Sequence, residues 1–260
     1  MTLATARTVR LDLAYDGTCY HGWQVQPNAT TVQGCLLEAA GRVTGEAVRV
    51  TGASRTDAGV HALGQVASLQ TASTLGVPAL QAALNALLPR DIRVRSATEA
   101  SATFDARRSA RGKRYVYLVD NDAVAAPLAL RYAWHVREPL DAEAMAEALR
   151  TLLGRHDFSA FCASAGRDRE PTCMLRAVRV LRVRRFLVVL LSADSFLHHM
   201  ARNIVGSALE VGRGRRDPGW LRTVMESHDR TRAGMTAPAH GLCLLRVMYP
   251  RGRRGHQDIQ

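Results

Sequence analysis

The strongest constraint on the fold is an order of predicted strands and helices that occurs twice along the chain. In the first half, period-two alternation of apolar residues predicts strands, and helical spacing of apolar residues predicts helices. The predicted elements are a strand over 9–17, a helix over 31–45, strands over 48–52 and 65–69, a helix over 77–89 and a strand over 91–100. The order β-α-β-β-α-β is that of the split βαβ unit.

The second half broadly repeats this order and adds a helix. Its predicted elements are a strand over 112–121, a helix over 140–154, two strands within 174–196, a long helix over 196–212, a short helix after Asp217–Pro218 and a strand over 241–250. We therefore predict an α+β protein with one half at 1–110, a second at 111–250, and a basic, disordered tail at 251–260.

Charge indicates the class of partner. The chain has 35 basic and 23 acidic residues, a net charge of +12, which favours nucleic acid. Lys113 is the only lysine, which we attribute to codon bias, and the net charge stands regardless. The five cysteines are scattered without a Cys-x-x-Cys pair, which predicts reduced thiols and no zinc site. No apolar run nears the ~20 residues of a membrane span and no secretory signal is evident, so we expect a cytoplasmic protein.

Asp57, in the stretch GASRTDAGVHA (52–62), is the first candidate for chemistry. An aspartate before small residues commonly ends a turn or caps a helix, and residue type alone favours that interpretation. The alternative is an ionised carboxylate that acts as a nucleophile. Arg55, two residues away, could keep the carboxylate ionised and orient it.

The stretch DARRSARGKR (105–114) precedes a predicted strand that carries Tyr115 and Tyr117. Its basic residues are Arg107, Arg108, Arg111, Lys113 and Arg114. They form either a solvated loop or a set of phosphate contacts that leads to rings able to stack on a base. Arg202, on the long helix, forms either a structural salt bridge or a bond to a phosphate or carboxylate.

The histidines predict no metal site. His198 and His199 are adjacent on the predicted long helix, so their side chains should point to different sides of it, and no His-Glu-x-x-His motif occurs. His21 and His61 lie near glycine turns, where we expect polar contacts beside a cleft rather than metal ligation.

Several stretches, in order, resemble the TruA-type tRNA pseudouridine synthases. They are AYDGTCYHGWQVQPNATTVQGCLLEA (14–39), GASRTDAGVHALGQVA (52–67), KRYVY (113–117), HDFSAF (156–161), FLHHMARNIVGSALEVG (196–212) and GLCLLRVMYP (241–250). The run Arg-Thr-Asp-Ala-Gly-Val-His is the most specific. The stretch 163–175 departs from the family, and Ser54 stands where a glycine is common.

The resemblance implies isomerisation of uridine to pseudouridine at positions 38, 39 and 40 of the tRNA anticodon stem-loop, without a metal or organic cofactor. It implies two ferredoxin-like halves that share a continuous mixed β-sheet, the pseudouridine synthase fold, and a homodimer in which one tRNA touches both subunits.

The resemblance also implies the roles of individual residues. The catalytic aspartate falls on Asp57, and the other active-site residues fall on Arg55, Tyr115 and Arg202. We add His61 and the basic residues of 105–114 as candidates for RNA binding. Glycines 52 and 59 are expected to let RNA backbone approach closely.

Alternative functions remain open at this point. The chain could be a tRNA-binding or tRNA-folding protein without catalysis, or a pseudouridine synthase that acts on a different RNA. A metal hydrolase is a more distant third.

Overall fold

The computed structural model describes residues 6–163 and 170–250 of the chain. The first half contains β1 (Arg7–Tyr15), α1 (Val32–Thr44), β2 (Arg49–Gly52), β3 (His61–Thr71), α2 (Val77–Leu87) and β4 (Ile92–Ala100). All six elements predicted for this half are present. β3 is longer than predicted and begins four residues earlier, at His61.

The second half contains more elements than predicted. In order they are β5 (Gly112–Asp120), η1 (Pro127–Ala129), β6 (Trp134–His135), α3 (Ala142–Arg150), β7 (Gly154–Asp157), η2 (Ser159–Phe161), β8 (Thr172–Val183), β9 (Phe186–Ala193), α4 (Met200–Gly212), α5 (Trp220–Ser227), η4 (Arg230–Arg232), η5 (Ala239–Gly241) and β10 (Leu242–Met248). β6 and β7 escape prediction because each is too short to show periodicity.

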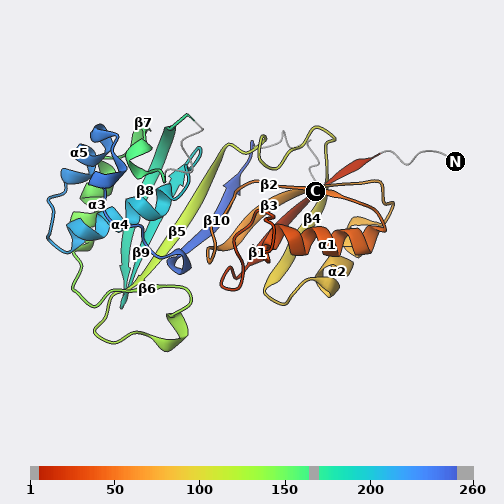
Figure 1. The fold of residues 1–260 in the computed structure, drawn as a ribbon, viewed down its shortest axis with the longest axis horizontal. Coiled ribbons are helices and arrows are strands. Elements are labelled where there is room, and N and C mark those ends of the chain that lie inside the picture. Colours follow the sequence, from red (N-terminus) through yellow and green to blue (C-terminus); the bar gives the residue numbers. More distant parts are fainter. Residues whose placement is uncertain (1–5, 164–169, 251–260) are drawn as a thin grey trace, which may run out of the picture.

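One mixed sheet runs through both halves in the order β4-β1-β3-β10-β5-β9-β8-β7, with β2 paired to β3 and β6 paired to β5. β4-β1-β3-β2 in the first half corresponds to β10-β5-β9-β8 in the second. In Figure 1, α1 and α2 lie over the strands of the first half, and α3, α4 and α5 lie with those of the second. The prediction of two ferredoxin-like halves on a continuous sheet is confirmed.

The two halves meet where β10 lies between β3 and β5. The start of β3 pairs in parallel with β10, through Cys243↔His61 and Leu244↔Ala62, and the end of β3 pairs with β2. β10 pairs antiparallel with β5 along its length. The segment between β2 and β3 is therefore held at the junction of the halves. The predicted boundary near residue 110 lies between β4 and β5 and stays a prediction.

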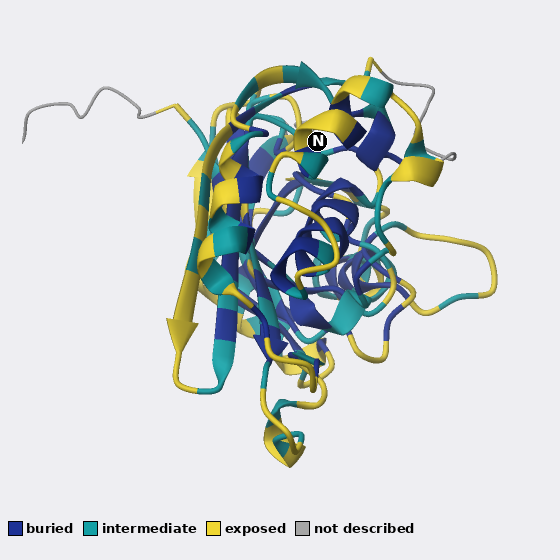
Figure 2. Ribbon diagram, turned by 90° about the vertical axis from the view of Figure 1, so that its left-hand side faces the viewer, coloured by how far each residue is buried: buried dark blue, intermediate teal, exposed yellow. Residues whose placement is uncertain are grey.

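Buried residues form one hydrophobic cluster that extends through both halves. They gather where the helices meet the sheet, as the dark blue regions of Figure 2 show. Across residues 6–163 and 170–250, no helix combines the length and the apolarity needed to cross a bilayer. The tail over 251–260, predicted to be disordered, lies outside the described residues.

The long helix begins four residues later than predicted. Residue 199 precedes the first turn of α4 and adopts a left-handed backbone, with a φ of 60°. This conformation cannot continue a right-handed helix, so α4 starts at Met200. The two histidines before it therefore belong to a connecting segment, which changes where their side chains point.

Candidate active site

A cleft of about 900 Å³ opens at the junction of the two halves. Its walls come from the segment between β2 and β3, from residues near the start of the chain, from β5 and from the N-terminal end of α4. Its basic lining residues are Arg49, Arg55, Arg107, Lys113 and Arg202. Asp57 is the one carboxylate among the described residues that line it. The cleft thus favours a polyanion and holds a single acidic side chain.

Asp57 begins a tight turn. Its carbonyl accepts a hydrogen bond from the amide of Val60 at 3.1 Å, and Gly59 takes a positive φ of 77°. A turn residue with positive φ favours glycine, because a Cβ is strained there. The preceding residue, Thr56, accepts from the amide of Trp23 at 3.0 Å through its carbonyl, and its hydroxyl contacts the Tyr15 hydroxyl at 2.8 Å. Asp57 is therefore both a turn residue and a firmly placed one.

A buried glutamine holds the other side of this segment. The side-chain amide of Gln65 donates to the carbonyl of Ser54 at 2.7 Å, and its oxygen accepts from the amide of Ser54 at 3.2 Å. The hydroxyl of Ser54 then lies 2.9 Å from the hydroxyl of Tyr115. Ser54 thus connects the Asp57 segment to β5.

Arg202 makes the ion pair with Asp57. Its Nη1 donates to Asp57 Oδ2 at 2.9 Å, and its Nε donates to the carbonyl of Ala237 at 2.7 Å. Both side chains are largely shielded, with exposed fractions of 15% for Arg202 and 23% for Asp57. Arg202 lies in the first turn of α4, so the positive end of the helix also faces the carboxylate.

Arg55 does not take the position expected of it. The Arg55 side chain is exposed in the cleft and makes no hydrogen bond or ion pair within residues 6–163 and 170–250. The expectation that Arg55 pairs with Asp57 is therefore wrong for this structure, and Arg202 supplies that cation instead.

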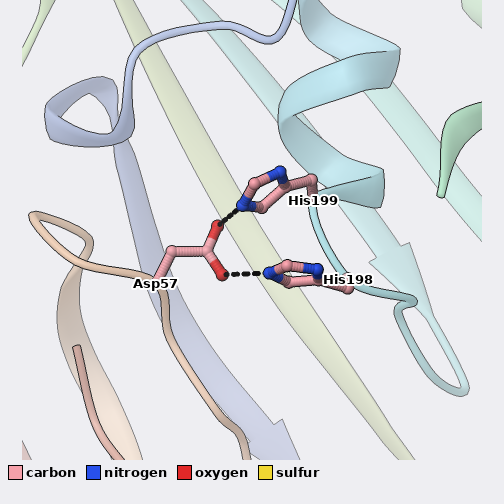
Figure 3. A group of neighbouring side chains, drawn as sticks. All are labelled: Asp57, His198 and His199. Atoms are coloured by element: carbon pink, nitrogen blue, oxygen red, sulfur yellow. Dashed lines mark ion pairs between the residues drawn. The ribbon is translucent and has the colours of Figure 1, made fainter. Parts of the chain in front are cut away.

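His198 and His199 both point at Asp57. Figure 3 shows the two imidazole rings facing the carboxylate from the same side. Nε2 of His198 lies 3.8 Å from Asp57 Oδ1, and Nε2 of His199 lies 3.4 Å from Oδ2. Their ring centroids are 4.0 Å apart. The expectation that they point to different sides of a helix is wrong, because both precede α4 and the left-handed backbone at 199 turns the two rings to one side.

The protonation of His199 follows from its surroundings. Burial lowers the pKa of His199, and although the Asp57 charge opposes this, the nearby His198 and Arg202 lower the pKa further. His199 is thus a neutral imidazole at neutral pH. Asp57, His198 and His199 together offer ligand atoms that all lie within 4.8 Å of one another, which is a candidate group for holding a metal ion.

Tyr115 lies beside this group on β5. It is buried, and its ring meets that of Phe196 edge to face, with centroids 5.0 Å apart and an interplanar angle of 82°. Burial raises the pKa of Tyr115 to about 12, against the opposing effect of the Ser54 hydrogen bond and with a further rise from the Asp57 charge. Its hydroxyl is therefore protonated at neutral pH.

The predicted RNA-binding residues fall into two groups. Arg107 and Lys113 line the cleft, whereas Arg108, Arg111 and Arg114 are exposed but do not line it. On β5, Lys113 and Tyr115 share one face of the sheet and Arg114 faces the other, because side chains alternate along a strand. Arg107 and Lys113 thus lie in the cleft that holds Asp57, and RNA contact by all five residues stays a prediction.

The structure removes His61 from the predicted RNA-binding set. The side chain is buried, and its Nδ1 accepts from the amide of Gly17 at 3.0 Å. Its Nε2 lies 3.0 Å from the carbonyl of Arg131 and 3.1 Å from that of His240. His61 joins three backbone segments and does not line the cleft, so its role is structural.

Gly52 also serves a different purpose from the one expected. A Cβ at this position would overlap with the indole ring of Trp23, which is 1% exposed. The space beside Gly52 is therefore filled by protein and is not left for RNA backbone. Gly59, by contrast, has only a Cβ contact of 3.4 Å with Ala239, and its glycine is required by the turn.

Several supporting contacts have no local signal in the amino-acid sequence. The hydrogen bonds of Gln65 and of the Ala237 carbonyl link residues far apart in the chain. Phe196 and the histidine pair stand in one of the quoted stretches, FLHHMARNIVGSALEVG, so the resemblance marked their neighbourhood without assigning them a role.

Comparisons with known proteins agree in naming one family. The family described as "tRNA pseudouridine synthase" matches residues 13–107 and 148–250. A protein of Pelobacter propionicus named tRNA pseudouridine synthase A is 44% identical over 243 residues, covering 94% of this chain and 100% of the relative. Proteins with the same name from Myxococcus xanthus (45% identical; 94% and 92% covered) and Thermoanaerobacter sp. strain X514 (44% identical; 94% and 100% covered) are similarly close.

Proposed function

This chain belongs to the tRNA pseudouridine synthase family, an isomerase family, and we propose that it converts uridines of the tRNA anticodon stem-loop to pseudouridine through the carboxylate of Asp57. The observation that carries the assignment to Asp57 is its placement. It is the one carboxylate among the described residues that line a basic cleft, and it is ion-paired and hydrogen-bonded to Arg202.

The reaction makes limited demands on the protein. The N1–C1′ bond breaks, the uracil turns, and a C5–C1′ bond forms; C5 loses its hydrogen as a proton and N1 gains one. Atoms and electrons balance without an oxidant or a reductant. What the protein must supply is a positioned carboxylate, a surface that holds the turning base, and contacts that keep the nucleotide out of the helix.

Asp57 is the reacting group in each route we consider. It attacks C1′ of the ribose, or it attacks C6 of the base, or it acts as a base on the way to a glycal. In each of these routes the carboxylate reacts as the anion, and the Arg202 guanidinium beside Oδ2 provides the counter-charge. The N-terminal end of α4 adds a favourable potential.

Tyr115 supplies the surface for the uracil. Its ring lines the cleft next to Phe196 and can stack on a flipped base. With a pKa of about 12, its hydroxyl rarely exists as phenolate at neutral pH. Because the hydroxyl stays protonated, Tyr115 is suited to stacking on the base rather than to accepting a proton.

Arg55 helps to keep the target nucleotide flipped out of the RNA stem. A nucleotide in a stem must leave the stack before Asp57 can reach it, at a cost of a few kcal/mol. Arg55 is exposed in the cleft beside Asp57, where a guanidinium can occupy the space that the nucleotide leaves. Arg107 and Lys113, also on the cleft, contribute phosphate contacts that offset the cost of flipping.

We place the enzyme in the cytoplasm as a homodimer in which one tRNA contacts both subunits. The resemblance within 14–250 and the basic cleft support this assignment. Sedimentation of the protein with and without tRNA would give the stoichiometry directly.

The test of the proposed function is tritium release from tRNA that carries 5-tritiated uridine. Formation of the C5–C1′ bond must expel that hydrogen, so release reports the isomerisation itself. We expect release by the native chain and none by Asp57→Ala, with tRNA binding retained. No release from either, with tRNA bound, would favour a binding protein or a different RNA substrate. Equal release from both would remove Asp57 from the chemistry.

A further inference from the structure

The mechanism gives no role to His198 and His199, which lie beside Asp57. Arg202 already pairs with Asp57, yet two imidazoles also point at the same carboxylate (Figure 3). Arg202 already supplies the counter-charge that the proposed role of Asp57 requires. Convergence of two imidazole nitrogens on one carboxylate is the donor set of a transition-metal site.

The spacing of the three groups fits such a site. Ligands held at ~2.1 Å around a tetrahedral ion lie about 3.4 Å from one another. Here the imidazole nitrogen of His199 lies 3.4 Å from one oxygen of Asp57, and that of His198 lies 3.8 Å from the other. Because the three ligand atoms all lie within 4.8 Å of one another, movements of about 1 Å would bring them to coordination distance around one ion.

We propose that Asp57, His198 and His199 form a site for a divalent transition metal such as Zn²⁺, and that an ion bound there reversibly inhibits the enzyme. The inhibition rests on the proposed function, because it requires Asp57 to be the reacting group. The site itself rests only on the geometry. A metal bound to the carboxylate takes up the lone pair with which Asp57 reacts.

The chemistry of the ligands selects the ion. Imidazole nitrogen suits zinc, copper and nickel, whereas magnesium and calcium prefer oxygen ligands. Three protein ligands leave a further position open toward the cleft, which lets the ion enter from solvent. The site would therefore discriminate against the magnesium that accompanies tRNA.

Arg202 sets the affinity. Its guanidinium lies 2.9 Å from Oδ2, so a second cation at this oxygen meets electrostatic repulsion. The other oxygen, Oδ1, lies nearer to His198 and has no ion pair with Arg202 among the contacts of the described chain. We therefore expect a metal at Oδ1, with an affinity suited to reversible inhibition rather than to a permanent structural ion.

The first experiment measures binding without tRNA. Zn²⁺ is titrated into the full-length protein by calorimetry, and Co²⁺ is followed by its visible absorption, which reports tetrahedral coordination. The variants are His198→Ala, His199→Ala, the double variant and Asp57→Asn. His21→Ala is the matched control, because His21 lines the same cleft and is outside the cluster.

We expect the native chain and His21→Ala to bind one equivalent of metal that the double variant lacks. Each single variant should bind that equivalent roughly 100-fold more weakly or worse, since even changes outside the first coordination sphere cost 10–100-fold. A histidine elsewhere that binds zinc would do so in all variants, so the difference isolates this site. Equal binding by the native chain and the double variant would overturn the proposal.

The second experiment measures inhibition of tritium release. We expect Zn²⁺ to inhibit the native enzyme, a chelator to restore activity, and Mg²⁺ not to inhibit. Zinc binding without any tritium release from the native chain would leave the site standing and reject the proposed function. Tritium release that depends on Asp57, without zinc binding, would reject the site alone. Zinc inhibition unchanged in the double variant would place the inhibition elsewhere.

Discussion

The guanidinium of Arg202 joins the carboxylate of Asp57, 145 residues away in the chain, to the backbone carbonyl of Ala237. The amide of Ala237 in turn donates to the carbonyl of Arg202 at 3.2 Å. Arg202 is thus held by the segment that follows α5 and holds a residue of the other half. The two halves of the sheet complete the site jointly, and neither contains both members of the ion pair.

Substitution Arg202→Met should therefore reduce catalysis more than tRNA binding. Methionine keeps the length and packing of the side chain and removes both hydrogen bonds, so the carboxylate loses its charge partner and its fixed orientation. Misplacement of a reacting group by ~1 Å costs on the order of 100-fold in rate. Single-turnover tritium release with saturating enzyme measures this step, and filter binding measures the affinity.

The matched control is Arg213→Met at the other end of α4. Arg213 is also largely buried and pairs with Glu210 at 2.8 Å, but it is remote from Asp57. We expect it to lower the midpoint of chemical unfolding without a comparable loss of single-turnover rate. If Arg202→Met weakened tRNA binding and left the single-turnover rate unchanged, Arg202 would be a phosphate contact instead.

The buried tyrosines predict a late alkaline transition. Burial raises the pKa of Tyr115 to about 12, and burial likewise raises the pKa of Tyr15, Tyr20, Tyr117 and Tyr249. A phenol with a higher pKa in the folded chain stabilises the fold fully below its unfolded pKa of about 10. That stabilisation is lost as the pH rises toward the folded pKa.

The measurement follows phenolate absorbance and far-ultraviolet circular dichroism as the pH is raised from 9 to 13. We expect most phenols to ionise only when the helical signal disappears, because ionisation of a buried ring and unfolding are linked. If the phenols ionised near pH 10 while the circular dichroism signal stayed unchanged, these rings would reach solvent more readily than the structure indicates.

The order of strands and helices could be predicted because it rests on local periodicity. The split βαβ order of both halves follows from alternating and helical apolar patterns, and the helix α1 begins after Thr31, whose hydroxyl accepts from the amide of Gly34 at 3.2 Å. Such signals lie within a few residues. β6, of two residues, and β7, of four, depend on partners elsewhere in the sheet and carry no such signal.

The position of the site could be predicted from the resemblance, but its contacts could not. Arg55 is near Asp57 in sequence and Arg202 is remote, yet Arg202 forms the ion pair. His198 and His199 converge because the backbone at His199 is left-handed, which is uncommon for a residue with a Cβ. Contacts of this kind are decided by tertiary packing and by single backbone angles, which periodicity does not report.

The close packing at Gly52 predicts a loss of stability in Gly52→Ala. The added methyl group would meet the buried indole of Trp23, which would have to move. Overfilling a packed core costs typically ~1–3 kcal/mol. Urea unfolding measures this cost, and tryptophan fluorescence of the folded variant reports the displacement of the ring.

Gly76→Ala is the control for Gly52→Ala. Gly76 precedes α2, has a φ of −56°, and an added Cβ there meets nothing within 4 Å. We expect its unfolding free energy to change by no more than ~0.5 kcal/mol. Equal stability of the two variants would mean that Trp23 can give way without cost.

The two faces of β5 predict unequal contributions of neighbouring cations to tRNA binding. Lys113 lines the cleft, whereas Arg114 is exposed on the opposite face of the strand. A cation that contacts a phosphate releases counterions, so its removal makes the negative slope of log K against log salt less steep by roughly 0.7–0.9. We expect Lys113→Ala to weaken tRNA binding and to make this slope less steep by the amount that one phosphate contact contributes. Arg114→Ala should change neither the affinity nor the slope by a comparable amount. Filter binding over a series of salt concentrations separates the two, because a loss of general positive charge would weaken both variants alike. A larger effect from Arg114→Ala would move the RNA path to the other face of the sheet, away from Asp57, and would contradict the cleft as the binding site.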